Sequence, residues 1–425
     1  MFKKNLVFLC FFFFAITLNA QDTIRVMVYN LLYYGEYFSN CTANNNNPDN
    51  KDANLRTILP HDLPDIFVVN EMSRSAYFQQ RIIDSVLHKV SGRVYARAVS
   101  YNLADQNIVN MMYYNTHKLV LHSQAVMQTI TRDIDLYKLY YKSPDLSEGD
   151  TAFIHCIAAH LKAGSSGGDQ QTRRNQINNV MAWLQNNSQP HNFLFMGDFN
   201  VQSVQEESMQ ALLYGQNIPF RFYDPVDQLG TWNNNPDFAL YHTQSTQTSG
   251  DCHSGGGLDD RFDFILASAD IMQGNKKVRF VEGSYRTLGQ DGLHFNNSLL
   301  GSPFNSSAPF GVIEALYQNS DHLPVLLSLA IDQSPAVSFI PFLPGISFSY
   351  NNPVDDILSI HLKGLDPGTT YQVNIYSALG EHIASQSDSL NDKPVQINFS
   401  HQPKGIYLVE FKMLQFSRVL KVVKF

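Results

Sequence analysis

The chain has 425 residues, of which 44% are hydrophobic, and its formal net charge at pH 7 is −8. This length is enough for two or three domains with hydrophobic cores of their own. The acidic balance argues against a general binder of polyanions, because contacts to phosphate groups normally use Lys and Arg. A nucleic-acid substrate would need a local basic patch or bound cations.

The first twenty residues have the pattern of a secretory signal peptide. A short basic start, MFKK, precedes the apolar run NLVFLCFFFFAITL, and the small-residue sequence LNA ends just before Gln21. The run is shorter than the roughly 20 apolar residues that a membrane-spanning helix needs. We therefore expect residues 1–20 to be removed, the protein to be secreted or held at the cell surface, and no stable membrane insertion. An uncleaved anchor is the alternative.

After this segment, short apolar runs alternate with helical patterns. The predicted strands are, in chain order, TIRVMVYN, DIFVVNE, VNMMYYN, AFIHCIAAHL, NFLFMGDFN, DRFDFILAS and HLPVLLSLAI. Between them, FQQRIIDSVLHKV and QTRRNQINNVMAWLQNN place apolar residues three and four positions apart, which predicts helices. Such alternation indicates a layered α/β domain, which we assign to residues 21–332.

The pattern of apolar and polar residues changes after this domain. Prolines break the pattern over residues 333–345, which predicts a linker. Residues 346–425 hold short alternating strands with turn residues between them, which predicts a small antiparallel β-sandwich. We expect no chemistry there, because its histidines, His361, His382 and His401, are scattered along the sequence.

Three cysteines remain after the expected signal peptide, and they form neither a disulfide framework nor a zinc-binding spacing. Cys156 lies inside an apolar strand pattern and is predicted to be a buried free thiol. Cys41 and Cys252 both lie in polar loops of a chain expected to be exported. The residues leave open whether these two cysteines pair.

Polar side chains stand at or near the ends of the predicted strands. They are Asn30, Glu71, His160, Asp198, Asn200, Asp263, Asp321 and His322. In layered α/β proteins, sites assemble where several strands end together. Carboxylate and amide oxygens suit Mg²⁺, Mn²⁺ or Ca²⁺, and histidines beside carboxylates can exchange protons near neutral pH. Each residue alone is typical of a strand end or turn, but the set favours metal-assisted attack of water on a phosphoester.

The ordered set resembles the endonuclease/exonuclease/phosphatase superfamily. The matching blocks cover roughly residues 22 to 332, and they are VYN at Asn30, NEM at Glu71, AHLKAG at His160, GDFN at Asp198–Asn200, RFDFI at Asp263 and SDHLPV at Asp321–His322. The resemblance implies a four-layer α/β sandwich, in which two mixed β-sheets pack face to face and helices cover the outside.

The resemblance also implies a metal centre and a water-positioning corner. Glu71 would bind a divalent metal, with Asn30 and Asp321 nearby in its coordination shell. Mg²⁺ is the expected ion, and Mn²⁺ and Ca²⁺ are the alternatives. Asp198 would orient or deprotonate the attacking water, and Asn200 would help to fix the water and the phosphate.

The remaining residues of the set would act on the phosphate. His322, steered by Asp263, would contact the scissile phosphate or act as a base, and His160 would stabilise the phosphate oxyanion or protonate the leaving group. Which histidine is the acid and which is the base stays open. Lys162 and Arg173 would bind substrate through their positive charge, and ordinary surface charge at a helix start is the alternative for Arg173.

The expected activity is that of a secreted, divalent-metal-dependent phosphodiesterase, most readily a nuclease acting on extracellular DNA or RNA. One alternative is a lipid or inositol phosphate hydrolase of the sphingomyelinase type. Another is a surface binding protein with a vestigial site. The aromatic run LLYYGEYF after Asn30 would suit either a lipid or a stacked base. We expect a monomer.

The end of the chain resembles the C-terminal sorting domain of type IX secretion in Bacteroidetes-like bacteria. The resemblance rests on IYSALGEHI, PKGIYLVEF and the basic-apolar end RVLKVVKF. It implies that the secretion machinery is a partner of residues 346–425. A generic β-sandwich adhesion module is the alternative.

Overall fold

The computed structural model describes residues 22–143, 146, 151–188, 191–216, 218–332, 347–363, 367–377, 382–391, 393–413 and 416–425. The expected signal peptide, residues 1–20, and the expected linker, residues 333–345, lie outside the described residues. The chain divides into two compact units, residues 1–334 and 335–425. Within the described residues, no helix has the length and apolar character needed to cross a membrane.

The first sheet of the first unit is mixed. Its strands lie in the order β11 (Val278–Phe280), β13 (Val325–Ile331), β1 (Asp22–Tyr34), β2 (Ile66–Ser73), β4 (Ile108–Asn115) and β3 (Tyr95–Arg97), and β12 (Arg286–Thr287) pairs with β13. β1 runs parallel to β2 and antiparallel to β13. As a result, the chain leaves β1 and β2, and enters β13, at the same edge of the sheet.

The second sheet is also mixed. Its strands lie in the order β5 (Leu119–Gln128), β6 (Ile134–Tyr141), β7 (Phe153–His160), β8 (Phe193–Asp198), β10 (Asp263–Ser268) and β9 (Phe222–Tyr223). β7 and β8 are parallel and end in register, with His160 opposite Asp198. β10 runs antiparallel to β8, so that Asp263 pairs with the same Asp198.

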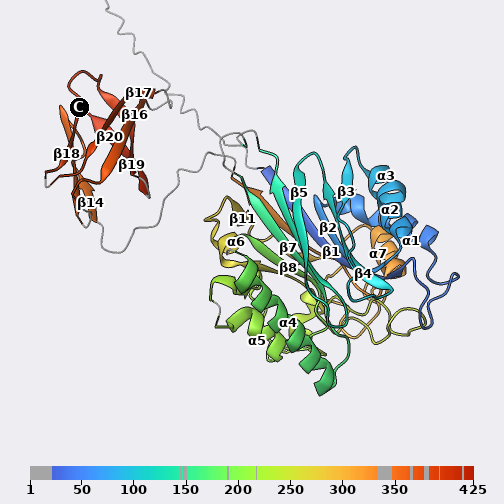
Figure 1. Ribbon diagram of the computed structural model, residues 1–425. Helices are drawn as coiled ribbons and strands as arrows, with labels where there is room; N and C mark the ends of the chain where they lie inside the picture. The colour runs from blue at the N-terminus through green and yellow to red at the C-terminus, as the bar shows by residue number, and fades with distance from the viewer. Residues whose placement is uncertain are drawn as a thin grey trace, which may run out of the picture. The chain divides into compact units, whose positions relative to one another are not determined.

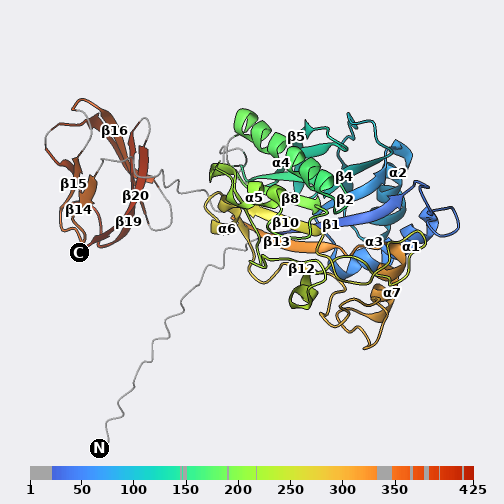
Figure 2. The same ribbon diagram turned by 90° about the horizontal axis from the view of Figure 1, so that it is seen from below.

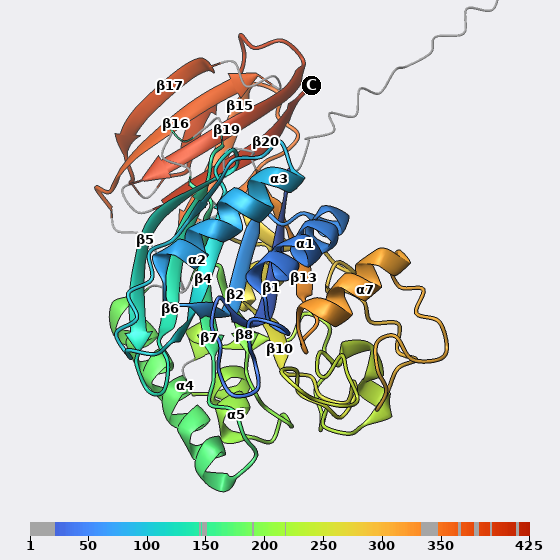
Figure 3. The same cartoon turned by 90° about the vertical axis from the view of Figure 1, so that its right-hand side faces the viewer.

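Helices cover the outer face of each sheet (Figure 1, Figure 3). On the side of the first sheet lie α1 (Pro48–Ile58), α2 (Ala76–Arg81), α3 (His88–Val90) and α7 (Phe310–Asn319), and on the side of the second lie α4 (Gly167–Asn187) and α5 (Glu207–Tyr214). Short helical segments complete the unit: η1 (Leu59–Asp62), η2 (Ile82–Leu87), η4 (Ile218–Phe220), η5 (Pro236–Tyr241) and α6 (Ala269–Gln273). Figure 2 shows β8, β10, β1 and β13 in the middle of these layers.

The alternation of side chains along the strands explains the four layers. In β8, Leu194 and Met196 pack in the core between the two sheets, whereas Phe193 and Phe195 pack in the core under α4 and α5. Successive side chains of a strand point to opposite faces, and both faces of these strands are covered, so the strands are apolar throughout. The predicted four-layer α/β sandwich is therefore confirmed.

The second unit is an antiparallel β-sandwich with a core of its own. One sheet has the order β14 (Ser347–Tyr350), β15 (Ile357–Lys363) and β18 (Val395–Asn398), and the other has β17 (His382–Ser389), β16 (Thr370–Ser377), β19 (Gly405–Met413) and β20 (Phe416–Lys424). Side chains from both sheets, such as Ile360, Val373 and Val409, are fully buried together. This confirms the sandwich expected at the end of the chain.

Gly197 allows the ends of β7 and β8 to approach each other. Its φ is +139°, and a Cβ atom at this position would lie 1.8 Å from the carbonyl oxygen of Ala159. Only glycine fits such a backbone and such a close contact. The glycine of the sequence MGDFN therefore sets the place of Asp198, the next residue.

Substitution of Gly197 by Ala should lower the free energy of unfolding of the first unit by more than ~2 kcal/mol, because the added methyl group meets backbone rather than a movable side chain. Urea unfolding followed by tryptophan fluorescence isolates this unit, since Trp183 and Trp232 are the two tryptophans of the chain. In the matched control, Gly311→Ala, the described residues place no atom within 4 Å of the new methyl group. The control should be neutral or slightly stabilising, and equal effects of the two substitutions would contradict this account.

Candidate functional site

The polar strand ends of both sheets face one cavity of about 520 Å³. Of the residues predicted from the sequence, six line this cavity: Glu71, His160, Asp198, Asn200, Asp321 and His322. Asn30 and Asp263 lie directly behind them, fully buried. The structure thus brings together eight of the ten predicted site residues, which come from strands of both sheets and from the loops next to them.

The side chain of Asn30, at the end of the regular part of β1, is the hub of the site. Its Nδ2 donates to Glu71 Oε1 at 3.1 Å and to Asp198 Oδ2 at 3.0 Å. The same nitrogen lies 3.5 Å from His322 Nε2, and Asn30 Oδ1 accepts a hydrogen bond from the backbone N–H of Leu32. One neutral amide therefore holds two carboxylates from different sheets and an imidazole at fixed distances.

Glu71 is turned toward the hub by an irregular backbone. Its φ is +57°, and the pairing of β2 with β4 shifts register between Val69 and Met72. Such a bulge changes the face to which a side chain points, and a positive φ at a residue other than glycine is a form of strain that is common at functional sites. Leu32 and Tyr33 in β1 also have positive φ values, and the N–H of Tyr33 donates to Glu71 Oε2 at 3.1 Å.

A group of Glu71, His160 and Asp198 offers ligand atoms that lie within 4.8 Å of one another, which is close enough to hold one metal ion. Glu71 was expected as a ligand, whereas His160 and Asp198 were expected to act on phosphate and water. Asn30 directs its amide nitrogen, not its oxygen, at the two carboxylates. Asp321 Oδ2 accepts from the N–H of Ser254, and its Oδ1 is buried without a hydrogen-bond partner among the described residues.

The charges of the cavity fit a cation. Burial raises the pKa of Glu71, and the nearby carboxylate of Asp321 raises it further. Burial also raises the pKa of Asp198, to about 7, and Asp263 and Glu71 add to this shift. Carboxylates crowded in a buried site repel one another unless a proton or a cation lies between them. The oxygen-rich donor set, with one imidazole, is of the type that hard divalent cations accept.

His322 and Asp263 form a buried ion pair behind the cavity. His322 Nδ1 lies 2.7 Å from Asp263 Oδ2, and the N–H of Asp263 is bound by Thr243 Oγ1. Although burial alone would lower it, the carboxylates of Asp263 and Asp198 hold the pKa of His322 well above its usual range. The other ring nitrogen, Nε2, lies 3.7 Å from Asp198 Oδ2 and 2.8 Å from Gln244 Nε2. Asp263 thus orients the ring so that Nε2 faces the cavity.

His160 has the opposite electrostatic environment. Its Nε2 lies 3.5 Å from Asp198 Oδ2 and 3.9 Å from Glu71 Oε1. Burial, with the nearby charges of Arg132 and His322, holds the pKa of His160 well below its usual range. A neutral imidazole in this place can accept a proton or a metal ion at Nε2.

Asn200 fixes the corner after β8. Its φ is +53°, and its N–H donates to Asp198 Oδ1 at 3.0 Å, while its Nδ2 donates to the carbonyl of Leu161 at 3.3 Å. Asn is one of the residues that tolerate a left-handed backbone. The sequence GDFN therefore folds back on itself so that both polar side chains face the cavity.

The two cations expected to bind substrate have other partners. Arg173 is fully buried in α4, where it donates to Glu206 Oε2 at 2.7 and 2.9 Å and to the carbonyls of Lys162 and Gly164. Lys162 lies 2.8 Å from Asp169 Oδ1 and does not line the cavity. The prediction that Arg173 contacts substrate is therefore wrong, because its guanidinium is fully buried and paired with Glu206. Instead, Arg173 holds the loop after His160 in place through the carbonyls of Lys162 and Gly164.

Sequence reasoning missed further polar residues of the site, among them Arg132, Gln244 and Asn70. Arg132 lines the cavity and donates to the carbonyl of Leu161 at 3.2 Å. Gln244 Nε2 donates to Asp321 Oδ2 at 3.3 Å and lies 2.8 Å from His322 Nε2. Asn70 Oδ1 accepts from the N–H of Asp198 at 3.0 Å. Only Asn70 had a sequence signal, an amide inside the apolar run before Glu71. Arg132 and Gln244 lie in loops with no motif.

Cys41 and Cys252 form a disulfide, which answers the question that the sequence left open. Cys252 lines the cavity together with His253 and Ser254, and Cys41 lies in the loop after β1. The disulfide therefore links the loop after β1 to the segment of the cavity wall that contains Ser254. The N–H of Ser254 donates a hydrogen bond to Asp321. Cys156 is a buried free thiol, as predicted.

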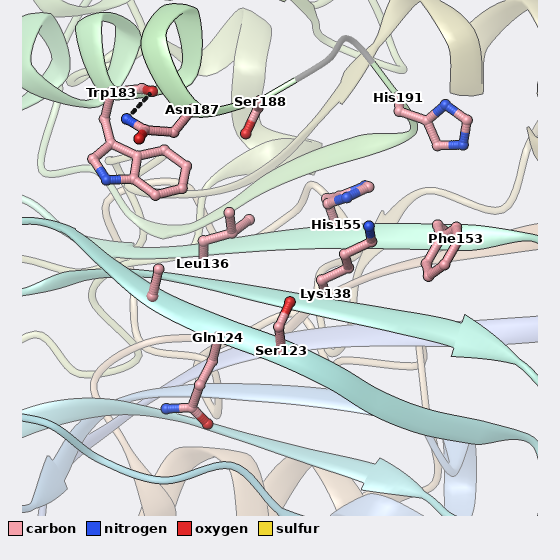
Figure 4. A pocket seen from close by; sticks show the side chains of 11 residues that line it. Ser123, Gln124, Leu136, Lys138, Phe153, His155, Trp183, Asn187, Ser188 and His191 are labelled. Atoms are coloured by element: carbon pink, nitrogen blue, oxygen red, sulfur yellow. Dashed lines mark hydrogen bonds between the residues drawn. The ribbon is translucent and has the colours of Figure 1, made fainter.

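A second cavity of about 470 Å³ lies at the opposite end of β7 from His160 (Figure 4). Phe153, His155 and Lys138 line it from the second sheet, and Trp183 lines it from α4. None of the described residues that line it is a carboxylate. This cavity therefore lacks the carboxylates that the first cavity provides, although His155 and His191 line it.

The second unit matches a known family. Residues 349–424 match the model of the secretion system C-terminal sorting domain. This match confirms the resemblance of the tail to a sorting domain, and it identifies the protein as secreted or held at the cell surface and as a client of a secretion machinery. The family matched does not extend into the first unit.

Solved structures with a similar fold include the following three. The endonuclease/exonuclease/phosphatase from Beutenbergia cavernae is 14% identical, with a TM-score of 0.44, and the match covers 94% of this chain and 99% of that chain. D. rerio TDP2 complexed with a single-strand DNA product is 12% identical, with a TM-score of 0.45, and the match covers 72% of this chain and 98% of that chain. The mannosyl-6-phosphatase of Bacteroides thetaiotaomicron is 14% identical, with a TM-score of 0.43, and the match covers 72% of this chain and 99% of that chain. No curated protein matches. These identities are too low to assign an activity to the chain.

Replacement of Arg173 by Met should lower the free energy of unfolding of the first unit by about 3–5 kcal/mol, because it leaves the carboxylate of Glu206 buried without its partner. The matched control is Arg174→Met, which breaks an exposed ion pair with Glu207 and should cost at most ~1 kcal/mol. Urea unfolding measures both. An Arg173→Met protein of unchanged stability that has lost substrate affinity would restore the substrate-binding role.

Proposed function

We propose that the protein is a secreted, divalent-metal-dependent phosphodiesterase, and that its substrate is extracellular DNA or RNA. The observation that carries the proposal is the convergence of Glu71, Asp198, His160 and the Asp263–His322 pair on one cavity, around a single amide. Carboxylates and imidazoles at these distances suit the hydrolysis of a phosphoester. Among the described residues that line the cavity, no Ser or Cys side chain is hydrogen-bonded to His160 or His322.

Glu71 would hold the ion, and His160, Asp198 and the unpartnered oxygen of Asp321 would lie near it. Mg²⁺ is the expected ion, with Mn²⁺ and Ca²⁺ as alternatives. When bound, the ion supplies positive charge that offsets the phosphate and the buried carboxylates.

The residues of the chain position the reactants and move the protons. Asp198 Oδ2 accepts a proton from the attacking water, whose oxygen forms the new bond to phosphorus while the bond to the leaving oxygen breaks. Asn200 restricts the other carboxylate oxygen of Asp198 through its N–H. His322 Nε2, aimed by Asp263, contacts a phosphate oxygen. The leaving oxygen takes a proton from an imidazole at the cavity wall or from water.

Chelation and two substitutions test this proposal on oligonucleotides. EDTA should abolish cleavage, and added Mg²⁺ should restore it. Asp198→Asn and His322→Ala should each lower kcat/KM by a factor of about 10² to 10⁴, the usual contribution of a positioned acid or base. A plasmid and a single-stranded oligonucleotide, analysed on gels, provide the readout.

The control is His401→Ala, because His401 is an exposed histidine of the second unit, and its cleavage rate should equal that of the unaltered protein. Intact DNA and RNA after hours with Mg²⁺, Mn²⁺ or Ca²⁺ would overturn the nuclease assignment. Full activity in EDTA would overturn the metal dependence.

A further inference from the structure

The loop that follows β1, residues 35–41, carries two exposed aromatic rings at the edge of the catalytic cavity. We call it the rim loop. Tyr37 is 53% exposed and Phe38 is 59% exposed. Tyr33 and Ser39, on either side of them in sequence, line the cavity, and the ring of Phe38 lies 5.6 Å from the ring of Tyr33. The exposed rings are therefore continuous with the wall of the site.

The backbone of the rim loop is held in place although its side chains are exposed. The Nδ2 of Asn46, a buried residue, donates to the carbonyls of Tyr33 and Glu36, and Ser73 donates to the carboxylate of Glu36. At its end, Cys41 is bonded to Cys252. Rings presented on a fixed backbone lose little freedom when a ligand covers them, which favours binding.

The loop enters this arrangement through a turn that requires glycine. Gly35 has a φ of +80°, and a Cβ atom there would lie 2.4 Å from the ring of Phe78. Two large aromatic side chains that are exposed together on a fixed loop beside a cavity offer a surface that a ligand could cover.

The charges near the cavity limit how a polyanion could bind. In the part of the chain that the structure describes, Arg132 is the one Arg or Lys side chain among the residues lining the cavity. Lys162, Arg173 and Arg174 are each paired with a carboxylate. Duplex DNA is normally held through many phosphate contacts, whereas the described residues that line the cavity supply one cation. Stacking of bases on aromatic rings is the other source of affinity for nucleic acids.

We propose that Tyr37 and Phe38 form a stacking platform for an unpaired nucleobase next to the scissile phosphate, and that the substrate is accordingly single-stranded. This inference rests on the proposed nuclease function and specifies its substrate. Bases of a duplex are already stacked on one another, so they cannot cover the two rings without being unpaired. The polar neighbours Ser39 and Asn40 suit a nucleotide at the rim better than the interior of a bilayer.

The test compares two substrates of equal length and charge on the full chain with Mg²⁺: a single-stranded oligothymidylate, and an oligomer in which each nucleotide is an abasic tetrahydrofuran residue. The double variant Tyr37→Ala/Phe38→Ala should raise KM for oligothymidylate about tenfold, with kcat within about twofold, and leave the base-free substrate unaffected. The ring-preserving variant Phe38→Tyr should behave like the unaltered protein. Tyr214→Ala is the matched control, since Tyr214 is also 53% exposed but belongs to α5 rather than to the rim loop.

The outcomes separate the two claims. If the unaltered protein cleaves no nucleic acid, the proposed function and the platform both fail. If it cleaves oligothymidylate but the double variant keeps the same KM, only the platform is overturned. Loss of binding to phosphatidylcholine vesicles in the double variant, with the KM for oligothymidylate unchanged, would overturn the platform and identify a membrane contact instead.

Discussion

The bond pattern of the Asn30 amide is the constraint on which the rest of the site depends. Its nitrogen donates to a carboxylate of the first sheet, Glu71, and to one of the second, Asp198. Two buried carboxylates repel each other, and a neutral donor with two hydrogens can satisfy both at once. Because β1 lies in the middle of the first sheet and contacts β8 of the second, the amide stands where the two sheets meet.

The free energy that holds these acids together comes from the core rather than from the site. Side chains of both sheets form one continuous apolar core between them, with members such as Val28, Val68 and Leu194 fully buried. Burial of such surface stabilises the fold by about 25 cal/mol per Å². The free energy of the core therefore offsets the cost of burying the carboxylates of Glu71 and Asp198, whose pKa values are raised. It also offsets the cost of the positive φ at Glu71.

Much of the fold and of the site follows from local patterns, whereas the partners of the charged loops do not. Asp198 and His322 were predicted because each belongs to a short motif at the end of an apolar strand, and the strand delivers it to the common edge. Arg173 has no local feature that separates it from Arg174. Its burial depends on Glu206, 33 residues further along, which is brought close only when α4 packs beside α5.

The disulfide has a topological consequence for a protein that works outside the cell. It joins two positions that are 211 residues apart in sequence, Cys41 and Cys252. Every strand from β2 to β9 lies inside the covalent ring that it closes. A single cut by an extracellular protease anywhere in that ring, for example at an exposed loop tip such as Leu103, leaves both pieces tied to each other. The enzyme can thus be nicked without shedding half of its site.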